Sequence, residues 1–448
     1  MSLPTYANYR ESGFIWLGSV PDDWTFEPLK RDTYVKARVG WKGLTSDEFE
    51  AQSDAYLVTG TDFKGRFIDW KSCYQVSESR YLDDSFIQLR NGDLLVTKDG
   101  TIGKTSMVAG LDKPACLNSG IFLVRPGGRY SSEYLYWVLN SNVFSAFVSS
   151  QSSGSTIQHL YQKAFVDFTF AFPDRVTQAS IADYLDAQTA KIDALIVKQE
   201  QLIETLAERR QAVISHAVSK GIDPNPLMKD SGQAWLGPIP STWTATRLKA
   251  VSSVQTGLTL GKEVSHENGI ELPYLRVANV QTSGVDLAEV KTVVVDRSDW
   301  HRYRLRAGDV LMTEGGDIDK LGRGCIWNGE IDPCVHQNHV FAVRCAGSIS
   351  ARFLVYLLDA RVARSYFLLT AKKTTNLAST NSTTLGNLPL ALPGESEQLA
   401  IVDHLDHETS KIDALSAKAR EMIDLLKERR QALISAAVTG KIDVRGLA

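Results

Sequence analysis

Cysteine is scarce in this sequence and never stands in closely spaced pairs. The five cysteines are scattered along the chain and form no Cys-x-x-Cys pair, so neither a zinc site of the usual spacing nor a framework of disulfides is expected. One alternative is a metal site with Cys334, His336 and His339 as ligands. No second cluster supplies the remaining ligands, so we do not expect a metal.

Long hydrophobic runs are also missing. No stretch reaches about 18 uninterrupted apolar residues, so no transmembrane helix is predicted. The first segment, MSLPTYANYRESG, has neither the basic start nor the apolar stretch of a signal peptide. We therefore expect a protein of the reducing cytoplasm without a membrane partner.

Positive charge is not in excess, because 49 lysines and arginines are set against 52 aspartates and glutamates, which gives a formal net charge of −3. A protein that binds nucleic acid by itself is usually basic. A nucleic-acid function therefore requires basic residues gathered locally, or a partner that supplies phosphate contacts. The 448 residues, 43% of them hydrophobic, predict two to four domains with ordinary cores.

The familiar catalytic motifs of DNA enzymes are absent. The sequence has no Asn/Asp-Pro-Pro-Tyr/Phe motif of adenine methyltransferases and no Asp…Glu-x-Lys nuclease motif. The string GTIGKTS at 100–106 is similar to a phosphate-binding loop, but Lys98 stands where the first glycine of the Walker pattern belongs. A nucleotide hydrolase stays open as an alternative. Otherwise this is a glycine-rich turn whose backbone can approach a DNA phosphate, with Lys98 and Lys104 beside it.

The chain carries an internal repeat, which decides its organisation. The segment SGFIWLGSVPDDWTFEPLK starts at Ser12, and SGQAWLGPIPSTWTATRLK starts at Ser231. The shared Trp-Leu-Gly, Pro and Trp are called the opening motif below. A longer match joins 181–215 to 401–435, where KIDAL and ERRQA recur at the same places. Each half therefore has a repeated frame around a private insert, at roughly 25–177 and 244–397.

The two inserts share only a faint motif, NGDLLVT at 91–97 and AGDVLMT at 307–313. Short strand-like runs, at 55–58, 93–96 and 120–124, alternate with turns rich in Gly, Asp and Asn. Helical stretches are predicted at 131–142 and 351–363. Each insert is therefore predicted to be a compact α+β domain with a twisted sheet.

The repeated C-terminal runs are predicted to be long helices. They contain no Pro or Gly over about 35 residues and are rich in good helix formers, and Gly221 and Gly440 mark their ends. Apolar residues at alternating steps of four and three predict a heptad seam. In the first helix the predicted seam is Ile181, Leu185, Gln188, Ile192, Leu195, Gln199, Leu202, Leu206, Arg209 and Val213. In the second it is Ile401, Leu405, Glu408, Ile412, Leu415, Ala419, Met422, Leu426, Arg429 and Leu433.

A helix roughly 50 Å long with one narrow apolar stripe needs a partner. We expect that partner to be the other copy in the same chain. The pair is then antiparallel, because a whole insert lies between the two copies and can reverse the chain. A coiled coil that joins two separate chains is the alternative.

Several turns of the inserts carry side chains suited to DNA. Arg and Lys bind guanine or phosphate, Asn and Gln pair with adenine, and Ser and Thr contact either. The candidates in the first insert are Lys36, Arg38, Lys42, Thr59, Thr61, Lys64, Lys98, Lys104, Ser155, Thr156 and Gln158. Those in the second are Arg276, Asn279, Arg302, Arg304, Lys320, Arg323, Lys372, Lys373, Asn376 and Asn381. The stretches 297–306 and 372–381 stand out, because they combine cations and amides without an apolar period.

Over nearly its whole length the chain closely resembles the specificity subunits of type I restriction–modification enzymes. The resemblance rests on the doubled opening motif and on KIDAL and ERRQA in the helices. It also rests on Pro173 with Gln178, and on Pro393 with Gln398, where the helices begin. The string TEGGDIDKLGRGCIWNGEIDPCVHQNHVF at 313–341 is similar to a recurring target-recognition sequence.

The resemblance implies an α+β fold with two target-recognition domains separated by two long helices. These helices pair as an antiparallel coiled coil in a pseudo-twofold internal repeat. The expected ranges are 1–177 for the first recognition domain, 178–222 for the central helix, 223–397 for the second recognition domain and 398–448 for the C-terminal helix.

The same resemblance implies a subunit without catalytic residues. Each recognition domain reads one half of an interrupted site in double-stranded DNA, while the helices set the spacing and dock two methyltransferase subunits. Those partners use S-adenosylmethionine to methylate adenine, and two endonuclease–translocase subunits can join. ATP and magnesium are expected on the partners, so this chain is expected to hold no cofactor. A coiled-coil scaffold that binds no nucleic acid is a third alternative.

Overall fold

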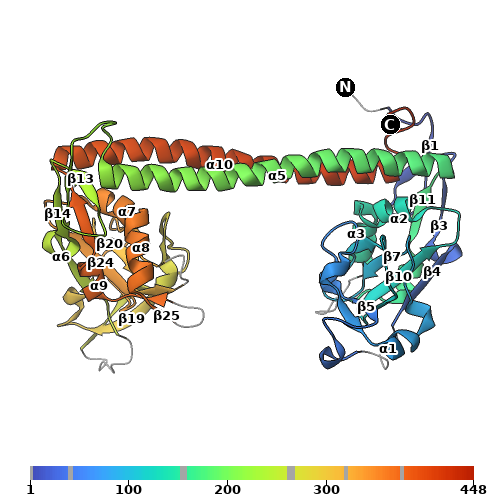
Figure 1. The fold of residues 1–448 in the computed structure, drawn as a ribbon, viewed down its shortest axis with the longest axis horizontal. Coiled ribbons are helices and arrows are strands. Elements are labelled where there is room, and N and C mark those ends of the chain that lie inside the picture. The colour runs from blue at the N-terminus through green and yellow to red at the C-terminus, as the bar shows by residue number, and fades with distance from the viewer. Residues whose placement is uncertain are drawn as a thin grey trace. The chain divides into compact units, whose positions relative to one another are not determined.

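The structure is a computed structural model that describes residues 4–38, 44–151, 159–259, 268–316, 321–373 and 378–447. The chain divides into two compact units. Unit 1 comprises Met1–Gln199 with Glu421–Ala448, and unit 2 comprises Glu200–Arg420. Each unit contains one private insert together with parts of both long helices (Figure 1).

Unit 1 is built on an antiparallel main sheet and a smaller mixed sheet. The main sheet has the order β4 (Thr33–Ala37), β10 (Ile121–Pro126), β7 (Leu94–Thr97), β8 (Thr105–Met107). The smaller sheet has the order β6 (Tyr74–Val76), β5 (Ala55–Val58), β9 (Ala115–Leu117), with β9 parallel to β5. Two strand pairs are β1 (Tyr9–Glu11) with β2 (Ser19–Pro21) and β3 (Thr25–Pro28) with β11 (Thr169–Phe172). The α-helices are α1 (Glu78–Leu82), α2 (Ser132–Leu139), α3 (Asn142–Gln151), α4 (Gln162–Val166) and the start of α5 (Arg175–Lys220).

The main sheet of unit 1 is a central layer, because its strands carry apolar side chains on both faces. Phe122 of β10 shares a buried cluster with Leu135 of α2, and α2 and α3 lie against this sheet in Figure 1. The next residue, Leu123, belongs to the cluster that contains Leu57 of the smaller sheet. Successive side chains of a strand point to opposite faces, so these continuously apolar runs are strands buried on both sides.

Unit 2 repeats this plan with different side chains. Its main sheet has the order β15 (Ser252–Thr256), β24 (Val340–Cys345), β20 (Val310–Thr313), β22 (Gly324–Ile326). Its mixed sheet has the order β19 (Lys291–Asp296), β16 (Gly269–Leu275), β23 (Val335–His336), with β23 parallel to β16. The other strands are β12 (Met228–Asp230), β13 (Pro238–Pro240), β14 (Thr244–Arg247), β17 (Val280–Gln281), β18 (Gly284–Val285), β21 (Gly315–Gly316), β25 (Lys372–Lys373), β26 (Ala378–Ser379) and β27 (Pro389–Leu392). The α-helices are α6 (Leu248–Val251), α7 (Ala351–Asp359), α8 (Arg361–Thr370), α9 (Ser382–Gly386) and the start of α10 (Glu395–Val438). The predicted α+β fold with an internal repeat is confirmed.

The long helices α5 and α10 pack together and run antiparallel, as predicted. In unit 1, Leu185 near the start of α5 shares a buried cluster with Val438 at the end of α10. In unit 2 the order is reversed, because Val218 near the end of α5 shares a cluster with Ile401 near the start of α10. The alternative of a coiled coil that joins two chains is not needed to cover these residues.

The KIDAL and ERRQA motifs pair across the two helices. Arg430 Nε donates to Asp193 Oδ1 at 2.9 Å in unit 1, and Arg210 Nε lies 3.3 Å from Asp413 Oδ1 in unit 2. Each pair therefore joins the aspartate of one repeat to an arginine of the other. The KIDAL and ERRQA motifs therefore act together to set the register of the two helices.

Four of the ten predicted seam positions in each long helix are wrong by one residue. Leu195 and Leu202 are exposed, whereas Ile196 and Ile203, one residue later, point further inward. The same shift places Thr189 at a buried position, where its hydroxyl donates to the Leu185 carbonyl oxygen at 2.6 Å. Counted from Leu185, the sequence fits steps of three then four, which we predicted, as well as steps of four then three, which the structure shows. The leucines at the exposed positions favoured the wrong choice. The wrongly assigned seam residues are Gln188, Leu195, Leu202, Arg209, Glu408, Leu415, Met422 and Arg429.

A repeated proline and a glutamine five residues after it mark where each long helix joins its insert. Gln178 is fully buried, and its Oε1 accepts from the Ser131 N–H at 2.9 Å while its Nε2 donates to the Pro173 carbonyl oxygen at 2.8 Å. Gln398 makes the equivalent bonds to Ser350 and Pro393. A buried amide costs stability unless both of its ends are hydrogen-bonded. Glutamine therefore joins the helix to the loop before α2 or α7.

The opening motif packs on the glycine that ends a long helix. Trp24 and Trp243 are almost completely buried. A Cβ atom on Gly440 would lie 3.2 Å from the Trp24 ring, and one on Gly221 would lie 3.4 Å from the Trp243 ring. Both glycines also have a positive φ, of +66° and +80°, which favours glycine at a helix end.

The faint motif shared by the two inserts holds a buried ion pair. Asp93 accepts from the Arg90 N–H at 2.7 Å and from two nitrogens of Arg125 at 2.6 and 2.7 Å. Asp309 has the same position, with two bonds from Arg344 at 2.8 and 2.7 Å. Both carboxylates are almost fully buried, so each needs its arginine to offset the loss of hydration.

Replacing the buried carboxylate should destabilise unit 2. In Asp309→Asn the Arg344 guanidinium loses its counter-charge, and we expect the free energy of unfolding to fall by about 2–4 kcal/mol. Asp332→Asn is the matched control, because Asp332 also makes two bonds to an arginine, Arg304, but both side chains are substantially exposed. Calorimetric unfolding of the full chain should show a clear shift for Asp309→Asn and little for the control. Equal shifts would contradict the assignment.

Candidate nucleic-acid interface

Six candidate DNA-contact residues lie outside the described residues: Lys42, Ser155, Thr156, Gln158, Lys320 and Asn376. The other candidates fall into four groups according to burial, partners and position, and the groups differ in what they can offer to DNA.

The first group is buried. Arg38 Nε donates to the Leu117 carbonyl oxygen at 2.8 Å, and the Thr59 hydroxyl donates to Asp62 at 2.9 Å. Asn279 accepts from the Arg276 N–H at 2.9 Å and donates to carbonyl oxygens of the same loop. All three side chains have almost no exposed surface, so they can serve DNA binding only by shaping the loops that carry exposed candidates.

The second group is more exposed but already has a protein partner. Arg276 lies 3.3 Å from Glu289, Arg302 lies 3.8 Å from Asp299, and Arg304 makes two bonds to Asp332. Lys36 lies over the Phe86 ring at 5.6 Å. Thr61 bonds to the Thr59 hydroxyl, Lys98 lies 3.9 Å from Asp99, and Asn381 caps α9 through the Thr384 N–H. A phosphate would have to compete with these internal contacts.

The third group lines a groove in unit 2 that is floored by a strand of two glycines. The strand β21 pairs with β26, which also pairs with β25, so Lys372 and Lys373 lie two strands away from Gly315 and Gly316. A cavity of about 490 Å³ is lined by Val277, Glu314, Gly315, Gly316, His339, Lys372, Ala378 and Ser379. A second, of about 310 Å³, is lined by Val277, Val280, Gln281, Thr282, Thr313, Gly315, Gly316 and Arg323. We call these two cavities, which share Val277 and both glycines, the glycine groove.

The glycine groove brings together cations that are far apart in the sequence. Arg323 lines one cavity and Lys372 the other, and neither Lys372 nor Lys373 has an acidic partner within 4 Å among the described residues. A glycine strand leaves the backbone bare, which permits close approach of a ligand. The groove can therefore accept a polyanion without first breaking internal ion pairs of these two lysines.

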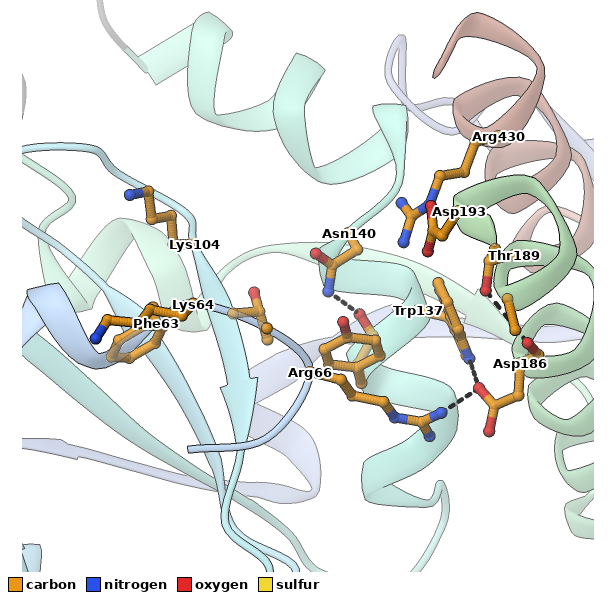
Figure 2. Close-up of a pocket in the computed structure, with 14 residues that line it drawn as sticks. Phe63, Lys64, Arg66, Lys104, Trp137, Asn140, Asp186, Thr189, Asp193 and Arg430 are labelled. Carbon is orange, nitrogen blue, oxygen red and sulfur yellow. Dashed lines mark hydrogen bonds and ion pairs between the residues drawn. The ribbon is translucent and has the colours of Figure 1, made fainter. Parts of the chain in front are cut away.

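Lys64 and Lys104 come together in unit 1 at a cavity of about 530 Å³ (Figure 2). Figure 2 shows these two lysines on the insert side of the cavity, and Asp186 and Asp193 on α5 on the other side. Among the described residues neither lysine has an acidic partner within 4 Å. Unpaired exposed cations suit a phosphate, because no existing contact has to be given up.

Sequence reasoning missed Arg66, which lies in the same loop as Lys64. Its guanidinium forms an ion pair with Asp186 of α5 and lies over the rings of Tyr136 and Trp137 at 5.2 and 5.7 Å. The Trp137 indole also donates to Asp186 at 2.9 Å. Arg66 thus ties the insert to the long helix, and only the recurrence of Asp186 in the second repeat, as Asp406, offered a signal in the sequence.

Two carboxylate–imidazole pairs were also missed. Glu314 Oε2 lies 2.5 Å from His339 Nδ1 in unit 2, and Asp99 pairs with His159 Nδ1 in unit 1. Both pairs stand where the third main-sheet strand, β20 or β7, ends. Each partner is remote in sequence, so no local pattern could reveal the pairs.

The glycine-rich string at 100–106 connects two strands. It forms the turn between β7 and β8, which pair antiparallel. A phosphate loop of nucleotide hydrolases joins a strand to a helix, so this hairpin lacks the helix N-terminus that such a loop uses. The alternative of a nucleotide hydrolase therefore receives no support from this loop.

The alternative metal site is not assembled either. His336 is buried, its Nδ1 lies 2.7 Å from the Val340 carbonyl oxygen, and burial lowers its pKa to about 4. Burial also raises the pKa of the Cys334 thiol to about 12, which disfavours the thiolate that binds metal. His339 pairs instead with Glu314. In the part of the chain that the structure describes, no three metal-binding side chains converge.

None of the described helices has both the length and the apolar character required to cross a membrane.

Comparison with known proteins finds similarity to the specificity subunits of type I restriction enzymes. A family model described as "Type I restriction modification DNA specificity domain" matches residues 47–205. The StySPI type I restriction enzyme specificity subunit of Salmonella potsdam is 24% identical over 438 residues, which cover 95% of this chain and 90% of that protein. The EcoKI specificity subunit of Escherichia coli K12 is 21% identical over 441 residues, with the same two shares covered.

Solved structures share the fold. A chain from a study of complex assembly and conformational transition in a type I R-M system matches with a TM-score of 0.70 at 16% identity, covering 94% of this chain and 99% of that one. The HsdS subunit of Thermoanaerobacter tengcongensis matches with a TM-score of 0.54 at 16% identity, covering 94% and 98%. The doubled frame, the family model over residues 47–205 and the relatives that align along 95% of the chain agree: the chain is similar along nearly its whole length to type I restriction–modification specificity subunits.

Proposed function

We propose that this chain is the DNA sequence-specificity subunit of a type I restriction–modification complex and performs no catalysis itself. Each private insert reads one half of a two-part site in double-stranded DNA, and the helix pair sets the spacing of the halves. The observation that carries this proposal is the doubled fold, in which two inserts share a strand order but differ in their loops. The relatives that align along 95% of the chain are named specificity subunits.

The proposed recognition domains are 1–177 and 223–397, joined to helical segments at 178–222 and 398–448. Within them, unpaired lysines such as Lys64, Lys104 and Lys372 contact phosphates, which position the protein without reading sequence. The remaining exposed candidates compete for bases or phosphates with their present partners. The proposed contacts outside the described residues are Lys42, Ser155, Thr156, Gln158, Lys320 and Asn376.

Exposed apolar residues on the long helices support the docking of two methyltransferase subunits. Leu195 and Leu202 on α5 recur as Leu415 and Met422 on α10, and all four are exposed. Apolar side chains repeated on a helix surface favour a protein partner, and their duplication favours two copies of it. The proposal places S-adenosylmethionine on these partners and ATP and magnesium on two endonuclease–translocase subunits, all in the cytoplasm.

The isolated chain should neither methylate nor cut DNA. We expect no transfer of label from S-adenosylmethionine by the pure subunit, and transfer once its methyltransferase subunits are added. DNA binding by the isolated chain should be weak and should decline steeply with salt, because the net charge is −3 and phosphate contacts dominate affinity. Methyl transfer by the pure chain alone would refute the non-catalytic assignment.

Exchange of one insert should change one half of the recognised site. Replacing 244–397 with the corresponding insert of another specificity subunit leaves the first insert unchanged. It also leaves the frame unchanged, including Gln398. Methylome sequencing of cells that carry the hybrid should show a new second half-site beside the original first half-site. The reciprocal exchange of 25–177 is the matched control and should alter only the first. A change in both halves from one exchange would contradict independent reading.

Lengthening both helices by one heptad should lengthen the spacer between the half-sites. Insertion of seven residues after Gln199 and after Ala419 keeps the buried seam in phase and adds roughly 10 Å to each helix. The spacer should grow by up to about three base pairs, because DNA rises about 3.4 Å per base pair.

A matched insertion of four residues is the control, because it throws the seam out of phase and should prevent assembly. Methylome sequencing measures the spacer directly. A heptad variant that methylates its site with an unchanged spacer would show that the helices dock partners but do not set the distance.

A further inference from the structure

The Glu314–His339 pair presents hydrogen-bond acceptors to the glycine groove. An ionised carboxylate can only accept, so the short contact from Glu314 Oε2 to His339 Nδ1, 2.5 Å, places the ring proton on Nδ1. The neutral ring then has an acceptor at Nε2. The His339 side chain is 56% exposed and that of Glu314 is 28% exposed, so a ligand in the groove can reach the pair.

The backbone holds both members of the pair in place. The Glu314 N–H donates to the His339 carbonyl oxygen at 2.8 Å, and the Thr380 N–H donates to the Glu314 carbonyl oxygen at 2.8 Å. Glu314 is therefore bonded on both sides where β20 ends. The backbone bond and the side-chain contact between Glu314 and His339 together limit the directions that the imidazole can take, which suits sequence reading.

The surroundings of the pair fit the edge of a nucleic-acid duplex. Gly315 and Gly316 contribute only backbone to the groove: a Cβ atom on Gly316 would meet nothing within 4 Å, and one on Gly315 would lie 3.1 Å from the Ala378 carbonyl oxygen. Lys372 and Arg323 line the same groove and suit the phosphates that flank a base. Cations and acceptors that line one groove are together complementary to phosphates and an amino-bearing base.

The first insert builds the same chemistry from other positions. The Lys98 N–H donates to the Gly120 carbonyl oxygen and the Leu160 N–H donates to that of Lys98, both at 2.9 Å. Lys98 therefore has the backbone place that Glu314 has in unit 2. The pair there consists of Asp99 and His159, the residues that follow Lys98 and precede Leu160. Two inserts with different loop sequences thus place a carboxylate–imidazole pair at one point of the fold.

We propose that His339, oriented by Glu314, reads an amino-bearing base, adenine or cytosine, at one position of the second half-site. In the major groove adenine N6 and cytosine N4 donate, whereas the matching groups of guanine and thymine, O6 and O4, only accept. An acceptor at His339 Nε2 therefore favours the first two bases and leaves an unpaired acceptor against the others. The Asp99–His159 pair has the corresponding place in the first half-site. The inference rests on the proposed function.

The test uses the full chain assembled with its methyltransferase subunits. Methylation rates are measured on duplexes in which each base pair of the second half-site is replaced in turn by the other three. The wild type should prefer adenine or cytosine over guanine and thymine at one position by about tenfold or more. His339→Ala should bring that ratio close to one and leave the other positions unchanged.

Two further variants separate base reading from a structural role. Glu314→Gln replaces a carboxylate, which only accepts, with an amide that can also donate to Nδ1. The imidazole proton is then no longer fixed on Nδ1, so the preference at the same position should weaken. His339→Arg replaces an acceptor with donors and should shift the preference at that position towards guanine, whose O6 and N7 accept. A purely structural role for His339 would reduce the rate equally for all bases. His404→Ala, which removes an exposed histidine of α10 outside the groove, is the matched control and should change no preference.

The outcomes also distinguish this inference from the proposed function. Preferences that His339→Ala leaves unchanged, or a loss of rate that is uniform over all bases, would overturn the reading by His339 while the bipartite specificity of the wild type stands. A wild-type complex with no base preference in either half would overturn the proposed function, and the inference with it.

Discussion

Burial of the seam between α5 and α10 is the constraint on which the rest of the structure depends. Each helix runs for more than 40 residues, and much of its surface away from the seam is exposed. Packing against the other helix therefore supplies most of the stability of each one. The ion pairs of Asp193 with Arg430 and of Asp413 with Arg210 are partly exposed and contribute little energy. Their value lies in register, because a slide of one helix would break both pairs at once.

The frame makes its contacts within itself and with the backbone of the inserts, and this leaves the inserts free to diverge. Gln178 and Gln398 bond only to backbone atoms of the adjoining loops, so they place no demand on the insert's side chains. Trp24 and Trp243 pack on helix-ending glycines that also belong to the frame. Inside the inserts, a buried aspartate directly before a main-sheet strand is paired with an arginine in both units, Asp93 with Arg125 and Asp309 with Arg344. An insert can therefore change its loops while its attachment stays the same.

The fold could be predicted because the internal repeat reveals the domain organisation directly. The role of a single side chain depends on neighbours that are remote in the sequence, so it could not be predicted in the same way. The doubled motifs predicted two α+β inserts and paired helices, and the structure agrees. The seam shows the limit: Leu195 and Ile196 are both apolar, and only the partner helix decides which one is buried. Arg38 and Arg66 show it again, since both are arginines of insert loops. One is bonded to a buried carbonyl oxygen and the other to a helix carboxylate.

Several arginines form ion pairs inside the protein, which helps to explain how a chain with a negative net charge fits a DNA-related function. Arg125 and Arg344 neutralise buried aspartates, and Arg210 and Arg430 hold the helix register. These cations serve the fold and are not available to DNA. The lysines at the two candidate surfaces are few, so the chain by itself can release few counterions from a duplex and can gain little affinity that way. Under the proposed function, partner subunits supply most of the affinity for DNA and this chain supplies the discrimination between sequences. This division suits an assembly in which one chain chooses the site and other chains carry out the reaction.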